Sequence, residues 1–196
     1  MNPKPQPAAA PAVPSARPAF TLPRTVALIG LMGVGKTTIG KRLAEAFALP
    51  FTDADEEIEK AAGQSIADIF ANYGEQGFRD GEQRVIARLL DSPVQILATG
   101  GGALISRLTR ERLKTRAITL WLKTDLAVLA RRVANRPHRP LLKDRDAMEV
   151  LQEHVRTRYP LYEVADIVVD TGDQPHARAV EMVIDALKTH VESGHG

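Results

Sequence analysis

A glycine-rich segment, Gly30-Leu-Met-Gly-Val-Gly-Lys-Thr37, limits the possible folds of this chain more than any other part of the sequence. It follows directly on the apolar run Thr25–Ile29 and leads into residues 37–47, which have helical periodicity. A buried strand, a glycine turn and a helix in this order are typical of a P-loop, G-x-x-x-x-G-K-S/T. Its glycines let backbone N–H groups close around phosphate oxygens, and the helix turns its positive N-terminal end toward them. The segment therefore predicts a nucleoside-triphosphate site.

Two side chains of the segment carry the expected chemistry of this site. Lys36 places an ammonium charge near the β- and γ-phosphates, and the Thr37 hydroxyl is a ligand that suits magnesium. A plain glycine turn capped by Thr37 is the structural alternative. The apolar strand before the segment and the helix after it favour the nucleotide site.

Short apolar segments and helical segments alternate along the remaining sequence. Further strands are predicted at residues 50–52, 94–99, 117–122 and 167–170. Helices are predicted as short pieces between residues 58 and 70 and at residues 81–90, 126–133, 148–158 and 177–188. Short, continuously apolar strands that alternate with helices indicate a parallel sheet covered on both faces. The prediction is one α/β/α domain.

Composition excludes several classes of protein. The formal net charge is +2, and the first 24 residues carry three basic and no acidic side chains, so residues 25–196 have a slight acidic excess. A basic surface for nucleic acid is therefore not expected. The chain has no cysteine, which excludes disulfide frameworks and thiolate metal sites and is compatible with a reducing compartment. The five histidines have no metal-ligand spacing, and no role is assigned to them.

The two ends of the chain differ from the part between them. Residues 1–24 hold seven of the 13 prolines, and they show neither helical nor strand periodicity. We expect a disordered Pro/Ala-rich tail at residues 1–24, a folded domain at residues 25–192 and a disordered end at residues 193–196. No apolar run approaches about 18 residues, so no transmembrane helix is expected.

Two aspartates, Asp53 and Asp55, follow the second predicted strand. Open α/β sheets bind ligands at the carboxyl ends of their strands. Because residues two apart in an extended segment point the same way, the two carboxylates can share one site. One would bind the water shell of a metal ion and the other a substrate hydroxyl. The alternative is that Asp55 only caps the helix after it.

Arg79 and Glu82 lie three residues apart on a predicted helix, and residues 100–102 are three consecutive glycines after a predicted strand. The Arg–Glu pair either presents a locked guanidinium to a substrate carboxylate or forms an ordinary surface ion pair. Consecutive glycines weaken local structure, which usually means that another group approaches the backbone closely. A flexible turn is the alternative.

Two further arginines lie in distinctive surroundings. Arg139 belongs to a polar, proline-containing loop, residues 136–145, and a loop of this kind can close over a phosphoryl group. Arg158 ends a predicted helix and begins the segment R-Y-P-L-Y. It either serves the site or completes the C-terminal end of its helix as a cation.

Taken together, six motifs resemble those of the shikimate kinase family. They are the P-loop, D-A-D at 53–55, F-R-D-G-E at 78–82, G-G-G at 100–102, R-P-L at 139–141 and R-Y-P-L-Y at 158–162. The likeness covers nearly the whole chain apart from the tail. It implies a three-layer α/β/α P-loop kinase fold of the nucleoside-monophosphate-kinase type, with a five-stranded parallel sheet in the order 2-3-1-4-5. Residues 55–90 would form the acceptor-binding part and residues 136–145 the lid.

The resemblance implies a kinase that transfers a phosphoryl group from ATP, with Mg²⁺, to the 3-hydroxyl of shikimate. The product is shikimate 3-phosphate, and the reaction belongs to aromatic amino acid biosynthesis through chorismate. The implied protein is cytoplasmic, and its partners are shikimate and ATP. A monomer is expected because no apolar helix face is left spare, and the charge and the lack of a long apolar run lead us to expect neither nucleic acid nor a membrane as a partner.

The resemblance also implies a role for each residue of the motifs. The catalytic residues would be Lys36, Asp55 and Arg139, and the metal would be held by Thr37 and, through water, Asp53. The nucleotide would be bound by Gly33, Val34, Gly35, Lys36, Thr37, Thr38, Arg132, Arg139 and Gln174. Of these, Arg132 would stack on the adenine and Gln174 would line its pocket. Shikimate would be bound by Asp55, Arg79, Gly100, Gly101, Gly102 and Arg158.

Three other functions are compatible with a P-loop. A gluconate kinase shares the P-loop and the lid but lacks the G-G-G and R-x-P-L-Y motifs. A ligand-sensing module that retains the fold would be indicated by loss of Lys36 or of the D-x-D pair, and both are present. A nucleic-acid-associated ATPase would have a basic groove, which the charge of residues 25–196 does not favour.

Overall fold

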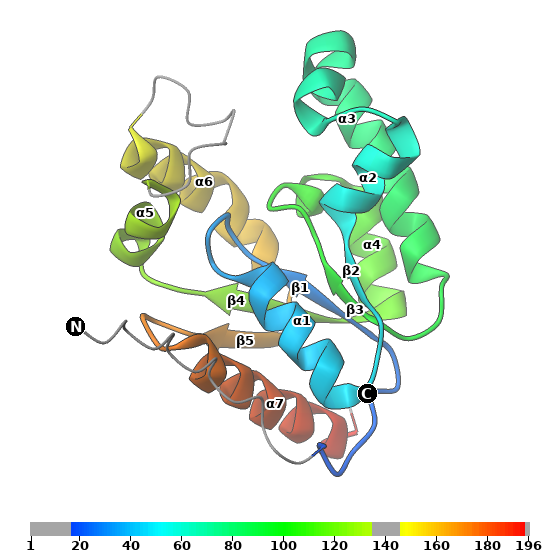
Figure 1. Ribbon diagram of the computed structural model, residues 1–196, viewed down its shortest axis with the longest axis vertical. Coiled ribbons are helices and arrows are strands. Elements are labelled where there is room, and N and C mark those ends of the chain that lie inside the picture. The colour runs from blue at the N-terminus through cyan, green and yellow to red at the C-terminus, as the bar shows by residue number, and fades with distance from the viewer. Residues whose placement is uncertain (1–16, 135–145, 195–196) are drawn as a thin grey trace, which may run out of the picture.

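Five parallel strands form one sheet at the centre of the protein (Figure 1). The computed structural model describes residues 17–134 and 146–194. The strands are β1 (Thr25–Ile29), β2 (Phe51–Asp53), β3 (Ile96–Ala98), β4 (Ala117–Lys123) and β5 (Ile167–Asp170). Their order across the sheet is β2-β3-β1-β4-β5, and each neighbouring pair is parallel. This order confirms the predicted fold.

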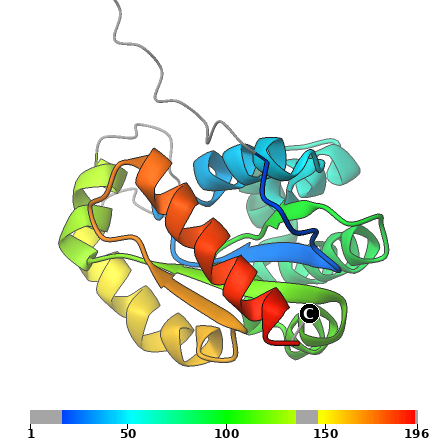
Figure 2. The ribbon, with the colours of Figure 1, turned by 90° about the horizontal axis from the view of Figure 1, so that it is seen from below.

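Helices connect the strands and cover both faces of the sheet. They are α1 (Lys36–Phe47), α2 (Ala54–Ala62), α3 (Ile66–Leu90), the short 3₁₀ helix η1 (Ala103–Ile105), α4 (Arg107–Arg116), α5 (Leu126–Ala134), α6 (Ala147–Tyr162) and α7 (His176–Glu192). Figure 2 shows α1 and α7 on one side of the sheet and α4 and α6 on the other. Among the described residues, each helix is too short or too polar to cross a membrane.

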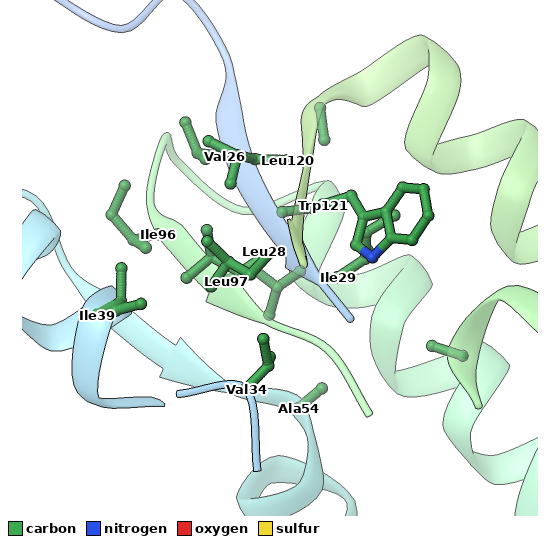
Figure 3. Close-up of a cluster of buried hydrophobic side chains, with 14 of the residues drawn as sticks. Val26, Leu28, Ile29, Val34, Ile39, Ala54, Ile96, Leu97, Leu120 and Trp121 are labelled. Carbon is green, nitrogen blue, oxygen red and sulfur yellow. The ribbon is translucent and has the colours of Figure 1, made fainter. Parts of the chain in front are cut away.

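The central strands form because their side chains are buried on both faces. All five residues of β1 are buried, and so are the three of β3 and all but the last of β4. Figure 3 shows Leu28 of β1 in this core together with Ile39 of α1 and Val34 of the P-loop. Each side chain of this kind stabilises the fold by about 1.5–3 kcal/mol when it is fully buried. Because Val34 belongs to the core, the P-loop is anchored to the sheet.

The helices between β2 and β4 agree only in part with the prediction. α3 consists of two helical pieces separated by a kink at Gly74, whose φ is 68°, which agrees with the predicted separate pieces. α4 is absent from the prediction. Its sequence, R-L-T-R-E-R-L-K-T-R, is strongly polar and buries only Thr109 and Leu113, so it has almost no apolar periodicity.

Helix α6 is longer than its predicted range, which ends at Arg158. It continues through Pro160 to Tyr162. Tyr159 and Tyr162 pack against Trp121 of β4, with ring centroids 4.9 and 5.6 Å from the indole. These contacts hold the last turn of the helix although proline lacks the N–H that the turn would use.

The packed part of the chain begins earlier than the predicted boundary at Thr25. Leu22 is 8% exposed and belongs to the core, and Phe20 packs edge-on against Phe47 at 5.3 Å between ring centroids. The expected tail of residues 1–24 is therefore too long, because two isolated apolar anchors create no periodicity that a sequence pattern could show. The predicted lid, residues 136–145, lies outside the described residues, as do residues 1–16, 195 and 196.

Candidate active site

A cavity of about 700 Å³ lies at the carboxyl ends of β1, β2 and β3. Its polar lining includes Lys36, Thr37, Thr38, Asp53, Asp55, Glu59, Arg79, Glu82, Gly100, Gly101, Gly102 and Arg158. Motifs from both halves of the sequence are thus brought to one site. The cavity has a nucleotide side, formed by the P-loop, and an acceptor side, formed by α3, the glycine turn at residues 100–102 and α6.

The P-loop has backbone conformations that only glycine adopts easily. Gly33 and Gly35 have φ values of 81° and 100°, and a Cβ atom at Gly33 would lie 2.8 Å from Val133 of α5. The Lys36 ammonium donates hydrogen bonds to the carbonyl oxygens of Gly30, at 2.8 Å, and Leu31, at 3.1 Å. These bonds hold the positive charge over the loop, where phosphate oxygens bind in sites of this type.

The oxygen atoms of Thr37 and Asp53 meet where α1 and β2 approach each other. The Thr37 hydroxyl donates to Asp53 Oδ2 at 2.9 Å, and Asp53 Oδ1 accepts from the backbone N–H of Asp55 at 3.1 Å. Hydroxyl and carboxylate oxygens are the donors that Mg²⁺ prefers, and the ion usually completes its shell with water and phosphates. The two residues therefore fit a magnesium ion beside the P-loop.

The two aspartates of the D-A-D motif do not lie on one extended segment. Asp53 ends β2 and caps α2, whereas Asp55 lies in the first turn of that helix, so the alternative role of Asp55 as a cap is wrong. Both side chains still line the cavity. Burial raises the pKa of Asp55, and the charge of Asp53 raises it further, while Lys36 and Arg79 act in the opposite direction. A carboxylate with a raised pKa is a better proton acceptor than an exposed one.

Arg79 and Glu82 form a buried ion pair on α3. Arg79 Nη1 donates to Glu82 Oε2 at 2.7 Å, and the two side chains are only 16% and 2% exposed, so this is not a surface pair. The Arg79 guanidinium also lies over the ring of Phe78, at 5.1 Å from its centroid. Burial raises the pKa of Glu82, and the neighbouring Arg79 lowers it. Held in this way, the guanidinium can turn its remaining donors to the cavity.

Each glycine of the turn faces a different charged side chain. A Cβ atom at Gly100 would lie 2.8 Å from Asp55 Oδ1, one at Gly101 would lie 3.1 Å from Arg158 Nη1, and one at Gly102 would lie 2.5 Å from Arg79 Nη2. None of the three glycines has a positive φ. Close approach, rather than backbone conformation, therefore requires glycine here, as the sequence interpretation expects.

Arg158 points from α6 to the glycine turn. It lies four residues before the end of the helix, so its alternative role as a terminal cation is wrong. Its Nη2 is 2.8 Å from His154 Nε2, and its Nη1 is the nearest atom to a Cβ built at Gly101. Burial lowers the pKa of Arg158, and the charge of Arg79 lowers it further, although an arginine remains protonated at neutral pH. Two guanidinium groups from different helices thus face one turn.

The predicted adenine-binding residues lie on the other side of the P-loop. Arg132 of α5 approaches Asp173 at 3.5 Å, and Asp173 directly precedes Gln174. The ring of His176 is 3.5 Å from the position of a Cβ at Gly35. Helix α5 and residues 173–176 therefore both flank the nucleotide side of the cavity. Arg139 lies outside the described residues.

The motif geometry agrees with the comparison to known families. The sequence pattern of the family described as shikimate kinase matches residues 32–188. A shikimate kinase of Caulobacter vibrioides is 53% identical over 165 residues, which are 84% of this chain and 82% of that protein. The chain belongs to the shikimate kinase family. It is therefore an enzyme, a kinase that uses ATP and phosphorylates shikimate in aromatic amino acid biosynthesis.

Two solved structures define how far the structural likeness extends. A shikimate kinase from Acinetobacter baumannii in complex with shikimate has a TM-score of 0.79 at 37% identity, over 87% of this chain and 94% of that chain. A gluconokinase from Sinorhizobium meliloti has a TM-score of 0.64 at 23% identity, over 90% of this chain and 98% of that chain. The second likeness shows a common fold alone, so it does not favour gluconate as the acceptor.

The sequence does not predict two of the residues that contact Arg158. They are His154 and Tyr162. Residues 154, 158 and 162 are four apart and therefore share one face of a helix. The predicted helix ends at residue 158, which leaves Tyr162 outside the element. A helix extended by one turn would have placed all three residues together.

Gly102→Ala is expected to raise the KM for shikimate about 10-fold or more with little change in melting temperature. The new methyl group would collide with the Arg79 guanidinium, which is the end of a long side chain. The side chain can move away at small cost to the fold, but it then leaves the position from which it would bind substrate.

Gly81→Ala on α3 is the matched control for this change. A Cβ there would meet nothing within 4 Å. It should stabilise the helix by about 0.5–1 kcal/mol and leave the KM for shikimate unchanged. Steady-state kinetics and thermal melting of both variants provide the measurement. An unchanged shikimate KM in Gly102→Ala would show that the position of Arg79 is irrelevant to the acceptor.

Proposed function

We propose that this enzyme transfers the γ-phosphoryl group of magnesium-bound ATP to the 3-hydroxyl of shikimate. One observation carries the choice of acceptor: Arg79 and Arg158 face the glycine turn in the same cavity as Asp55 and the P-loop. The two guanidinium groups can bind a carboxylate of the acceptor, and the Asp55 carboxylate can accept a hydrogen bond from one of its hydroxyls. The P-loop can bind the phosphates of the donor. Shikimate carries both of the groups that the acceptor side would bind.

The proposed nucleotide site uses the P-loop and both segments beside it. The N–H groups of residues 33–38 bind phosphate oxygens, and Lys36 contacts the β- and γ-phosphates. Arg132 and Gln174 bind the adenine, and Arg139 binds the phosphates. Magnesium, when bound, neutralises negative charge on the β- and γ-phosphates. The Thr37 hydroxyl and, through water, the Asp53 carboxylate would hold it.

The proposed acceptor site orients shikimate by its two ends. Arg79 and Arg158 bind the carboxylate, and the absence of side chains at residues 100–102 lets the ring lie close to the backbone. Asp55 accepts a hydrogen bond from the 3-hydroxyl. Glu82 holds Arg79 at 2.7 Å, so this guanidinium is oriented before the substrate arrives.

Phosphoryl transfer needs positioning and charge neutralisation more than covalent help from the protein. The 3-hydroxyl oxygen attacks the γ-phosphorus, the bond to the β-phosphate oxygen breaks, and ADP leaves. Asp55 takes the proton of the hydroxyl, for which its raised pKa is favourable. Lys36 and Arg139 stabilise the charge that develops on the transferred group.

We also propose that the enzyme works as a cytoplasmic monomer that binds no nucleic acid. The P-loop, Asp55, Arg79 and Arg158 of a single chain line one cavity, an arrangement that is compatible with a monomer. Residues 25–196 carry slightly more acidic than basic side chains, which does not favour a polyanionic partner. Size-exclusion chromatography with light scattering tests the oligomeric state.

A panel of acceptors tests the proposed reaction. ADP formation is measured with magnesium–ATP and either shikimate, gluconate or water as the acceptor, and the phosphorylated position is read from the NMR spectrum of the product. The proposal expects ADP only with shikimate, and phosphate on its 3-hydroxyl. Turnover with gluconate but not with shikimate, or phosphate on another hydroxyl, would contradict it.

A further inference from the structure

Tyr162, the last residue of α6 and of the R-Y-P-L-Y motif, has no part in the proposed function although it lies against the acceptor site. Only 1% of it is exposed. Its hydroxyl donates a hydrogen bond to the carbonyl oxygen of Gly101 at 2.5 Å, and the Arg158 guanidinium, whose Nη1 faces Gly101, is close enough to lower the pKa of the same hydroxyl. The hydroxyl thus lies beside both the middle glycine of the turn and the arginine that faces it.

The chemistry of the three groups determines what the hydroxyl donates and what it can accept. A guanidinium has donors and no acceptor, and a carbonyl oxygen has acceptor positions only. A phenolic hydroxyl can accept from the first and donate to the second at the same time. Burial raises the pKa of Tyr162 to about 12, although the charge of Arg158 lowers it, so the hydroxyl keeps the proton that it donates to Gly101.

The ring of Tyr162 is itself held in place. Its centroid lies 5.6 Å from that of Trp121 and 6.2 Å from that of Tyr159. Trp121 belongs to β4 and to the buried core shown in Figure 3. Closely packed aromatic side chains have few alternative rotamers. The hydroxyl therefore has a fixed position relative to the sheet, and so do the groups that bond to it.

We propose that Tyr162 is a positioning residue for the acceptor: it holds the Arg158 guanidinium against Gly101 in the orientation that receives the shikimate carboxylate. His154 contacts the same guanidinium, with its Nε2 2.8 Å from Arg158 Nη2. A long side chain held at two points loses its rotamer freedom during folding rather than during substrate binding, which strengthens binding. The inference rests on the proposed contact between Arg158 and the carboxylate.

Tyr162→Phe tests this role because it removes the hydroxyl and keeps the ring. The KM and the dissociation constant for shikimate should rise about 10-fold, whereas the KM for ATP and kcat should change by less than about twofold. A general loss of structure would instead affect both substrates. The stoichiometry of ATP binding gives the concentration of folded protein in each preparation. The dissociation constant for shikimate can therefore be measured even if part of a variant is unfolded.

Tyr159→Phe is the matched control. It removes the hydroxyl of the neighbouring tyrosine in the same ring cluster, and no hydrogen bond of that hydroxyl is found in the described part of the chain. It should leave the KM for shikimate unchanged. In an Arg158→Lys background, Tyr162→Phe should add little, because the group that it positions has already been replaced.

The outcomes separate this inference from the proposed function. A raised shikimate KM in both Arg158→Lys and Tyr162→Phe supports both. A raised value in Arg158→Lys alone overturns the role of Tyr162 and leaves the proposed function intact. Unchanged values in both variants overturn the carboxylate contact and the inference together. Equal increases in the KM of both substrates in Tyr162→Phe would reduce its role to general structural support and overturn the inference.

Discussion

Lys36→Ala is expected to lower kcat by roughly 10²–10³-fold or more and to leave the melting temperature nearly unchanged. The ammonium is the cation held over the P-loop, where it donates hydrogen bonds to two carbonyl oxygens of the loop. Its loss removes charge stabilisation from the transferred phosphoryl group without removing a side chain of the core. The measurement is steady-state kinetics at saturating magnesium–ATP and shikimate, with thermal melting in parallel.

The same variant has a second expected effect, on pH dependence. The charge of Lys36 lowers the pKa of Asp55, against burial and Asp53, which raise it. Without that charge the pKa of Asp55 rises further, so the acid limb of the residual activity should move to higher pH. Lys41→Ala, which changes an exposed lysine of the same helix outside the cavity, should alter neither kcat nor the acid limb. Near-full turnover in Lys36→Ala would show that the P-loop assignment is wrong.

The sheet and the nucleotide site could be predicted because their determinants are local. The run Thr25–Ile29 is buried on both faces, so it is continuously apolar and needs no partner strand to be recognised. The glycines and the lysine of the P-loop all lie within residues 30–36, and their spacing alone specifies the turn. The order of the five strands, which the resemblance to the family implies, is confirmed as well.

The acceptor side could be predicted as a set of residues but not as an arrangement. The sequence indicates close approach at residues 100–102, but only the structure shows that each glycine faces a different charged group. Likewise, the spacing of Asp53 and Asp55 predicts a shared site correctly for an incorrect reason, because β2 ends between them. Packing determines the residue at which a short strand ends and a helix begins, and a two-residue spacing carries no information about that packing.

The remaining errors come from contacts between distant segments. Phe20 and Leu22 look like part of a proline-rich tail until Phe47 and the core provide their partners. Tyr162 lies beyond a proline, where a helix is expected to end, and only the indole of Trp121 explains why the helix continues. Tertiary contacts of this kind leave no periodicity in the sequence.

Arg79→Lys and Arg158→Lys are expected to weaken shikimate binding much more than ATP binding. Lysine keeps the charge but loses the planar fork that binds a carboxylate with two hydrogen bonds. Loss of such a contact typically costs about 1.5–3 kcal/mol, or roughly 10- to 150-fold in affinity. The double variant should be non-additive, because both guanidinium groups are proposed to contact one carboxylate. Arg139→Lys should lower turnover with a smaller effect on shikimate affinity.

Titration of shikimate into these variants at saturating magnesium–ATP is the most direct test of the proposed acceptor site. Arg88→Lys is the matched control, because Arg88 is an exposed arginine of α3 that pairs with Glu57 outside the cavity. The proposed geometry predicts large, similar losses of shikimate affinity in Arg79→Lys and Arg158→Lys and no loss in Arg88→Lys. Unchanged shikimate affinity in both Arg79→Lys and Arg158→Lys would show that the acceptor binds elsewhere.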